Sequence, residues 1–173
     1  MHARVTGDRF HGGFELQDSR AWLGQDLTPE VLEGYRPSKA AEQAAAKLAI
    51  APEALLAQAA LETGWGRGMM RQDDGSPAFN LFGIKTHGAW DGARVATTTH
   101  EYVDGRRIEI RDEFRAYASP AESFDDYVDF LQSNPRYRGA LAEAGDPSRF
   151  LQGLQQAGYA TDPEYADKIR SIL

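Results

Sequence analysis

The stretch PEALLAQAALETGWG (residues 52–66) decides how this sequence is expected to fold. A proline in first position suits the opening turn of a helix, where its missing N–H is not needed. Leu55 and Ala59 recur at helical spacing and place Glu62 on the same inward face. Gly64, the first of three alternating glycines, ends the helix. The stretch therefore predicts a buried helix that carries an acidic residue near its end.

Patterns on either side of this helix predict a second helix and a β-hairpin. Ser38 is placed to cap the alanine-rich run KAAEQAAAKLAI (39–50), and alanine is the best helix former. Between residues 94 and 116 the sequence alternates with the period of a strand, on both sides of Asp104-Gly105. That dipeptide favours a tight turn, so this segment predicts a two-stranded hairpin.

The last third of the chain returns to helical signals. A capping residue precedes a proline at four places, and each pair predicts a helix start: Ser119-Pro120, Asn134-Pro135, Asp146-Pro147 and Asp162-Pro163. Helices, a hairpin and further helices predict an α+β fold that is mostly α, with a small β-hairpin lobe. We expect residues 38–173 to form one domain and residues 1–37 to form an N-terminal arm or linker, because glycines interrupt any period there.

Composition excludes several classes of protein. The 173 residues include 19 Lys and Arg, 26 Asp and Glu and no Cys, for a net charge of -7. The missing cysteines exclude a disulfide framework and a thiol nucleophile, and the acidic balance argues against nucleic-acid binding. The four histidines show no metal-binding spacing, so we expect neither a metal nor a cofactor. No apolar run predicts a membrane span, and the polar N-terminus does not resemble a secretory signal peptide.

Glu62 is the first candidate for chemistry. A glutamate on a helix is most often solvated or paired, here with Arg67. Apolar neighbours such as Leu56 and Ala60 weaken that interpretation, because a carboxyl among them loses hydration and its pKa rises. A carboxylic acid that keeps its proton near neutral pH is what general acid catalysis requires.

Glu101 lies on the first strand of the predicted hairpin. A glutamate there is usually only solvated. If the lobe folds over Glu62, however, the two residues form the pair of carboxyls that cleavage of a glycosidic bond usually requires.

The aromatic and polar candidates each allow two interpretations. Trp65 suits either a sugar platform or the core. The loop NLFGIK (80–85) either is buried or lines a polar cleft. Tyr159 and Tyr165 fit core aromatics, and for Tyr165 this interpretation is preferred.

Four ordered blocks of the sequence together resemble glycoside hydrolase family 73, and within it the peptidoglycan-hydrolase (β-N-acetylglucosaminidase) domains of flagellar proteins. The blocks are LLAQAALETGWG (55–66), NLFGIK (80–85), FRAYASPAESFDDYVDFL (114–131) and GYATDPEYADKI (158–169). The resemblance covers roughly residues 38–173 and implies a lysozyme-like helical fold. It also implies hydrolysis of β-1,4 bonds of N-acetylglucosamine units in peptidoglycan. Residues 1–37 depart from the family pattern.

The resemblance also implies roles for individual residues. It makes Glu62 the catalytic acid, Glu101 the second carboxylate, and Tyr159 a residue that helps to hold substrate or a water near the scissile bond. The residues expected to bind substrate are Trp65, Asn80, Phe82 and Lys85. Because Glu101 lies on a hairpin, we expect its carboxyl to lie further from that of Glu62, without ligand, than the about 5–5.5 Å of retaining or about 6.5–9.5 Å of inverting glycosidases.

The implied setting is the periplasm or cell wall of a bacterium. Peptidoglycan glycan strands are the expected substrate, flagellar rod proteins the expected further partners, and local wall opening during rod assembly the expected role. Two alternatives stay open: a lytic transglycosylase, which shares the fold and uses one glutamate, and a non-catalytic wall-binding or rod-scaffold module. A purely structural helical domain fits least well with four matching blocks.

Overall fold

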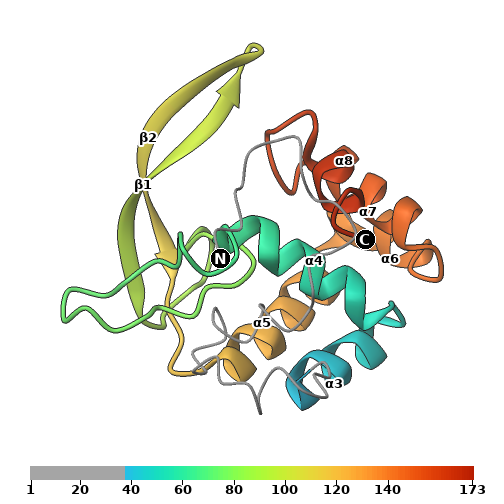
Figure 1. Cartoon of the computed structure of the whole chain (residues 1–173), viewed down its shortest axis with the longest axis horizontal. Helices are drawn as coiled ribbons and strands as arrows, with labels where there is room; N and C mark the ends of the chain where they lie inside the picture. The colour runs from blue at the N-terminus through green and yellow to red at the C-terminus, as the bar shows by residue number, and fades with distance from the viewer. Residues whose placement is uncertain (1–37) are drawn as a thin grey trace.

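The computed structural model describes residues 38–173, and the expected arm or linker at 1–37 lies outside the described residues. The described part contains six α-helices, one 3-10 helix and a two-stranded antiparallel sheet (Figure 1). Their order is α3 (Lys39–Leu48), α4 (Pro52–Thr63), β1 (Arg94–Val103), β2 (Arg106–Arg115), α5 (Pro120–Ser133), η2 (Pro135–Tyr137), α6 (Arg138–Ala142), α7 (Pro147–Gln156) and α8 (Tyr165–Arg170). The expected α+β fold, mostly α with a small β-hairpin lobe, is confirmed.

Helix α4 runs through the middle of the helical body (Figure 1). It begins at Pro52 and ends at Gly64, which adopts the left-handed conformation, as the sequence predicts. The sequence indicates one inward face, yet every residue from Ala54 to Ala60 is buried. The reason is that α3 and α8 both contact this helix, so a single apolar face would not be enough. Its buried polar residue, Gln58, is satisfied by tyrosines of α5 and α8.

The remaining helices pack around the same core. Helix α3 contacts α4 and α5, while α7 contacts α6 and α8. Fully buried side chains from α5 and α7 belong to this core, including Phe124, Leu131, Phe150 and Leu154. Within residues 38–173 no single helix has the length and apolar character needed to cross a membrane; α3 and α4 pass that test only as a pair, bent by 112°.

The hairpin forms a lobe that projects from the helical body (Figure 1). Val103 pairs with Arg106, so the turn contains two residues, Asp104 and Gly105. Both have positive φ, 50° and 74°, which a type I′ turn requires and which explains the Asp-Gly sequence. The lobe is attached at its base by a small second core of Ala78, Val95, Phe114 and Ala116.

The predicted helix starts are confirmed at three of the four prolines. Pro120 and Pro147 begin α5 and α7, and Pro135 begins η2, which leads into α6. The prediction at Pro163 is wrong, because α8 begins two residues later, at Tyr165. Asp162 caps a turn instead, since its side chain accepts a hydrogen bond from the backbone N–H of Glu164.

The close approach of α6 and α7 provides a test of this packing. A Cβ atom at Gly153 would lie 2.7 Å from the Cα of Ala140. We therefore expect Gly153→Ala to lower the free energy of unfolding by about 1–3 kcal/mol, the usual cost of overpacking. Urea denaturation measures this change. The matched control is Gly139→Ala in α6, where a Cβ meets open space and should stabilise the helix by about 0.5–1 kcal/mol. Equal stabilisation by both substitutions would contradict the packing described here.

Candidate active site

The carboxyl of Glu62 lies at the end of α4, between α8 and the loop that precedes the hairpin. On one side the hydroxyl of Tyr165 donates a hydrogen bond of 2.8 Å to Oε1. On the other side the backbone of Gly83 lies so close that a Cβ there would be 2.7 Å from Oε2. Gly83 also has a φ of +65°, so both its conformation and the space around it require glycine.

This position changes the acidity of Glu62. Burial raises the pKa of its carboxyl from 4.5 to about 7, the hydrogen bond from Tyr165 lowers the pKa, and the negative charge of Glu101 raises it. The increase is the one expected from the apolar neighbours in the sequence. A half-buried carboxyl that holds its proton near neutral pH is suited to act as a general acid.

Glu101 of β1 has the opposite environment. Lys85 forms an ion pair with its Oε1, and the hydroxyl of Thr161 donates a hydrogen bond of 2.5 Å to its Oε2. Burial works to raise the pKa of Glu101, but Lys85 and Thr161 outweigh it and hold the pKa below its usual value. Lys85 is itself shared with Asp112 of β2 at 2.9 Å. Glu101 is therefore ionised under conditions where Glu62 is protonated.

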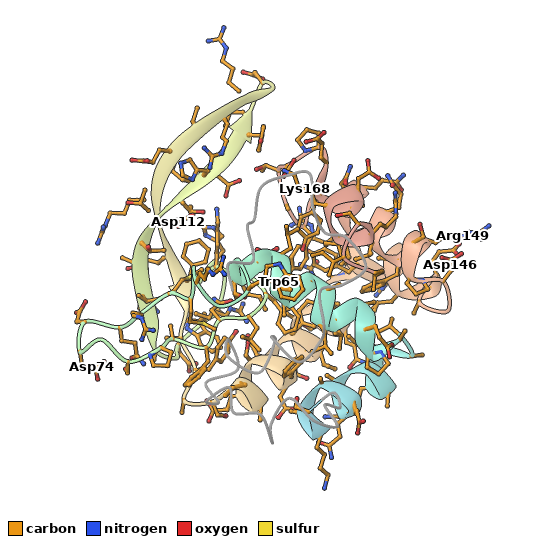
Figure 2. All side chains as sticks on the ribbon, in the orientation of Figure 1. Trp65, Asp74, Asp112, Asp146, Arg149 and Lys168 are labelled. Atoms are coloured by element: carbon orange, nitrogen blue, oxygen red, sulfur yellow. The ribbon has the colours of Figure 1, made fainter. Side chains whose placement is uncertain are left out.

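Thr161 connects the hairpin lobe to the C-terminal segment. Besides donating to Glu101, its hydroxyl oxygen accepts a hydrogen bond of 2.9 Å from the backbone N–H of Tyr102. One side chain thus holds both the main chain and the carboxylate of the first strand. The segment is itself anchored to α8 by an ion pair between Asp162 and Lys168. Figure 2 shows Asp112 on the hairpin and Lys168 on α8, with Trp65 beside α4.

Tyr159 lies in the loop between α7 and α8. Its hydroxyl donates to the backbone carbonyl of Phe82, and its ring stacks on that of Tyr165 with the centroids 5.8 Å apart. Burial and the charge of Glu62 raise the pKa of both tyrosines well above the usual value, so both stay protonated. Tyr159 therefore joins the loop before the hairpin to the last helix.

The residues expected to bind substrate lie mostly in the interior. Trp65 is 7% exposed and belongs to the core. Phe82 is fully buried and stacks on Tyr127, with the ring centroids 4.0 Å apart. Asn80 holds its own loop, because its side-chain amide donates to the carbonyl of Ile84 and accepts a hydrogen bond from the N–H of Ile84. A role of these side chains in substrate binding stays a prediction, as does that of the ion-paired Lys85.

Several site residues escaped the reasoning from sequence. Gln58 lies on the apolar helix, where a lone amide gives little signal. Thr161 and Asp112 are ordinary polar residues of a loop and a strand. Tyr165 is buried as expected, but its hydroxyl also contacts Glu62. The signal that was available is the sequence GYATDPEY, which places two tyrosines and a threonine within eight residues.

A metal site is not part of this arrangement among the described residues, where no group of three or more His, Asp and Glu side chains is placed to hold an ion.

Comparison with known proteins connects this geometry to a family. The family model described as mannosyl-glycoprotein endo-beta-N-acetylglucosaminidase (Glucosaminidase) matches residues 38–173. The chain is 52% identical over 132 residues to the peptidoglycan hydrolase FlgJ of Pseudomonas aeruginosa. The match covers 76% of this chain and 33% of that relative. It is 38% identical over 132 residues to the exo-glucosaminidase LytG of Bacillus subtilis, covering 73% of this chain and 44% of LytG. The chain thus spans less than half the length of either relative.

The fold is also similar to a solved structure. A crystal structure of a peptidoglycan hydrolase mutant from Sphingomonas sp. A1 superposes with a TM-score of 0.71 at 45% identity. The match covers 77% of this chain and 86% of that one. A related protein of known crystal structure therefore has a similar fold over most of this chain.

Glu62 should make stability depend on pH. The pKa of Glu62 is about 7 in the folded protein and 4.5 in the unfolded chain, so between these values the folded state holds the proton more tightly. The free energy of unfolding of the wild type therefore falls as pH rises through this range. The buried charge costs up to about 3 kcal/mol above that range. We expect Glu62→Gln to be more stable than wild type by about 1–3 kcal/mol near pH 8 and equally stable near pH 4. Urea denaturation across this range measures the difference.

The control for this prediction is Glu53→Gln, at an exposed position of the same helix. This variant keeps Glu62, so the fall in stability between about pH 4.5 and 7 should remain. A difference between Glu62→Gln and wild type that stayed constant across the pH range would show that Glu62 is not the group that titrates.

The Thr161 contact predicts a local change in hydrogen exchange. In Thr161→Val the Tyr102 amide loses its acceptor, so its exchange should become about five- to tenfold faster, the equivalent of one neutral hydrogen bond. NMR-detected exchange measures this rate. Thr161→Ser keeps the hydroxyl and should exchange like wild type. Unchanged exchange in the valine variant would mean that the lobe is not held here.

Proposed function

This chain belongs to the glucosaminidase family, glycoside hydrolase family 73, and from that premise we propose that it is a peptidoglycan hydrolase. It cleaves the β-1,4 glycosidic bonds of N-acetylglucosamine units within glycan strands, as an endo-β-N-acetylglucosaminidase. The observation that carries the proposal is the contrast between two carboxyls: Glu62, with a pKa of about 7, and Glu101, which is kept ionised. Glycosidic cleavage needs one protonated acid and one anion.

Each carboxyl has a defined part in the reaction. Glu62 protonates the glycosidic oxygen, so that the leaving sugar departs as an alcohol. Positive charge then develops on the ring of the other sugar, and Glu101 stabilises that charge or activates the water that attacks it. The N-acetyl group of the substrate is the third possible partner for this charge. The stereochemical course follows from which of these three reaches the anomeric carbon.

Lys85 and Thr161 support the role proposed for Glu101. The ion pair and the hydrogen bond keep its carboxylate charged without help from substrate. We expect the lobe that carries Glu101 to move toward Glu62 when a glycan strand binds. Tyr159 is proposed to act at the same site by holding Phe82 and Tyr165 in place and, through them, the position of substrate or water.

The proposed setting is the bacterial periplasm or cell wall. The Pseudomonas relative carries the name of a flagellar protein, FlgJ, and its name as a peptidoglycan hydrolase agrees with the chemistry proposed here. We propose that this chain opens the wall locally during assembly of the flagellar rod, with rod proteins as partners. A net charge of -7 makes general electrostatic attraction to an anionic wall unfavourable, so the site itself must provide the grip on substrate.

The runner-up is a lytic transglycosylase, which needs only one glutamate. The second carboxylate, held ionised by two dedicated partners, favours hydrolysis over that alternative. A non-catalytic wall-binding module has no need of a carboxyl whose burial destabilises the fold near neutral pH, so the pKa of Glu62 favours an enzyme.

Analysis of the products tests the proposal. Purified sacculi digested with wild-type protein should yield fragments with reducing N-acetylglucosamine ends, identified by mass spectrometry. Glu62→Gln removes the acid and should lower turnover by at least about 10²- to 10⁴-fold, with the fold preserved by circular dichroism. Glu53→Gln, exposed on the same helix, should digest like wild type.

Three outcomes would contradict parts of the proposed function. Products with 1,6-anhydro ends would identify a transglycosylase. Release of single sugars from chain ends only would identify an exo-enzyme, as the name of LytG describes that relative. Wild-type turnover in Glu62→Gln would remove Glu62 from the mechanism.

A further inference from the structure

A chain of three hydrogen bonds ends on the carboxyl of Glu62. The hydroxyl of Tyr127 is bonded to Oε1 of Gln58 at 2.5 Å. Nε2 of Gln58 is bonded to the hydroxyl oxygen of Tyr165 at 2.9 Å, and that hydroxyl is bonded to Oε1 of Glu62 at 2.8 Å. Tyr127 of α5, Gln58 of α4 and Tyr165 of α8 precede Glu62 in this chain, and all three residues are buried.

The chemistry of the groups gives this chain a direction. An amide nitrogen only donates, so Nε2 of Gln58 supplies a hydrogen to the oxygen of Tyr165. Tyr165 has a single hydroxyl hydrogen, which is then free to point at Glu62. Oε1 of Glu62 must accept that hydrogen, and it cannot carry a proton in the same direction.

The other carboxyl oxygen has different surroundings. Oε2 of Glu62 has no hydrogen-bond partner among residues 38–173, and it faces the bare backbone of Gly83. Any side chain at that position would overlap the carboxyl, because a Cβ would lie 2.7 Å from Oε2 and 3.2 Å from Cδ. The two oxygens are therefore distinguished by the protein: one is bonded from behind and the other is left open.

We propose that Tyr165 is a positioning residue that reserves Oε1 of Glu62 as an acceptor, so that Oε2, on the side of Gly83, carries the acid proton and delivers it to the glycosidic oxygen. The proposal deepens the function proposed above and rests on it for the final transfer. In that transfer the O–H bond of Oε2 breaks, a new O–H bond forms on the glycosidic oxygen, and the carboxylate left behind keeps its bond from Tyr165. The hydrogen bond that orients the acid thus also stabilises its conjugate base.

The groups that face Glu62 leave this assignment unambiguous near neutral pH. Tyr165 of α8, Tyr159 of the preceding loop and Tyr127 of α5 have pKa values raised well above the usual value, first by burial, and stay protonated. Glu101 of β1 is the remaining charged neighbour and stays ionised. Glu62 is therefore the group of this cluster that titrates around pH 7.

The decisive experiment is an NMR titration of the Glu62 carboxyl, with glutamate labelled by ¹³C, in wild type and Tyr165→Phe. If Tyr165 donates to Oε1, it favours the ionised form, and its removal should raise the pKa of Glu62 above that of wild type. In the same variant kcat on peptidoglycan should fall about ten- to hundredfold with little change in KM, because the acid is present but less well oriented. The basic limb of the pH profile should move upward.

Tyr117→Phe is the matched control. It removes another buried hydroxyl, which bonds Asp126 at 2.5 Å beside the base of the hairpin. It should alter thermal stability while leaving the titration of Glu62 and the basic limb where they are. A general loosening of the fold would instead move both variants alike, and that result would overturn a specific role for Tyr165.

The sign of the shift separates the possibilities. A pKa of Glu62 that falls in Tyr165→Phe would mean that Tyr165 accepts a proton from Oε1, and an unchanged pKa would mean that it exerts no control; either result overturns the proposal. An upward shift in a protein whose wild type does not digest sacculi would leave the positioning of the carboxyl established and refute the proposed function alone.

Gly83→Ala tests the open oxygen independently and keeps the proposal testable if Tyr165→Phe does not fold. The added Cβ would crowd Oε2, so kcat should fall at least about tenfold. Gly75→Ala has the same kind of positive φ but meets nothing within 4 Å, so it controls for backbone strain and should keep wild-type turnover. Wild-type kcat in Gly83→Ala would overturn delivery from Oε2.

Discussion

The constraint on which this structure depends is the partial burial of one carboxyl at the end of a largely apolar helix. A carboxyl that loses water must either be neutral or be surrounded by groups that replace the water. Here the protein does both in part: burial lifts the pKa of Glu62 to about 7, while Tyr165 replaces one hydrogen bond of the lost solvent. The neighbouring loop contributes by its lack of a side chain, because Gly83 leaves just enough space for the second oxygen.

The remainder of the molecule can be understood as the support for that carboxyl and its ionised counterpart. Helix α4 is buried on all sides from Ala54 to Ala60, and this buried part leads directly to Glu62. The hairpin carries Glu101 away from the helical core, where Lys85 and Thr161 can surround it without burying an uncompensated charge. One fold thus provides two environments that drive the acidities of two similar side chains apart, which is how acid and anion coexist at one pH.

Much of this could be predicted from the sequence because the signals are local. Pro52 and Gly64 bound the central helix, Asp104-Gly105 fixes the hairpin turn, and Glu62 has apolar neighbours at helical spacing. The relations that could not be predicted join residues far apart in the chain. Nothing near Gln58 indicates that two tyrosines satisfy its amide, and the start of α8 at Tyr165 instead of Pro163 depends on how Asp162 caps the turn before it. Asn80, named as a cleft residue, bonds the backbone of its own loop and also the carbonyl of Arg115, 35 residues later.

The long span of the contacts at Glu62 has a consequence for synthesis. Tyr165 lies 103 residues after Glu62, and Thr161 lies 60 residues after Glu101. During synthesis α4 and the hairpin therefore leave the ribosome well before the residues that complete the surroundings of their carboxyls. A nascent chain that has not yet docked α8 lacks the bond from Tyr165 to Glu62, and its Glu101 has Lys85 but not Thr161 as a partner. Since contacts between distant residues also form slowly, docking of α8 is the step that completes the surroundings of both carboxyls.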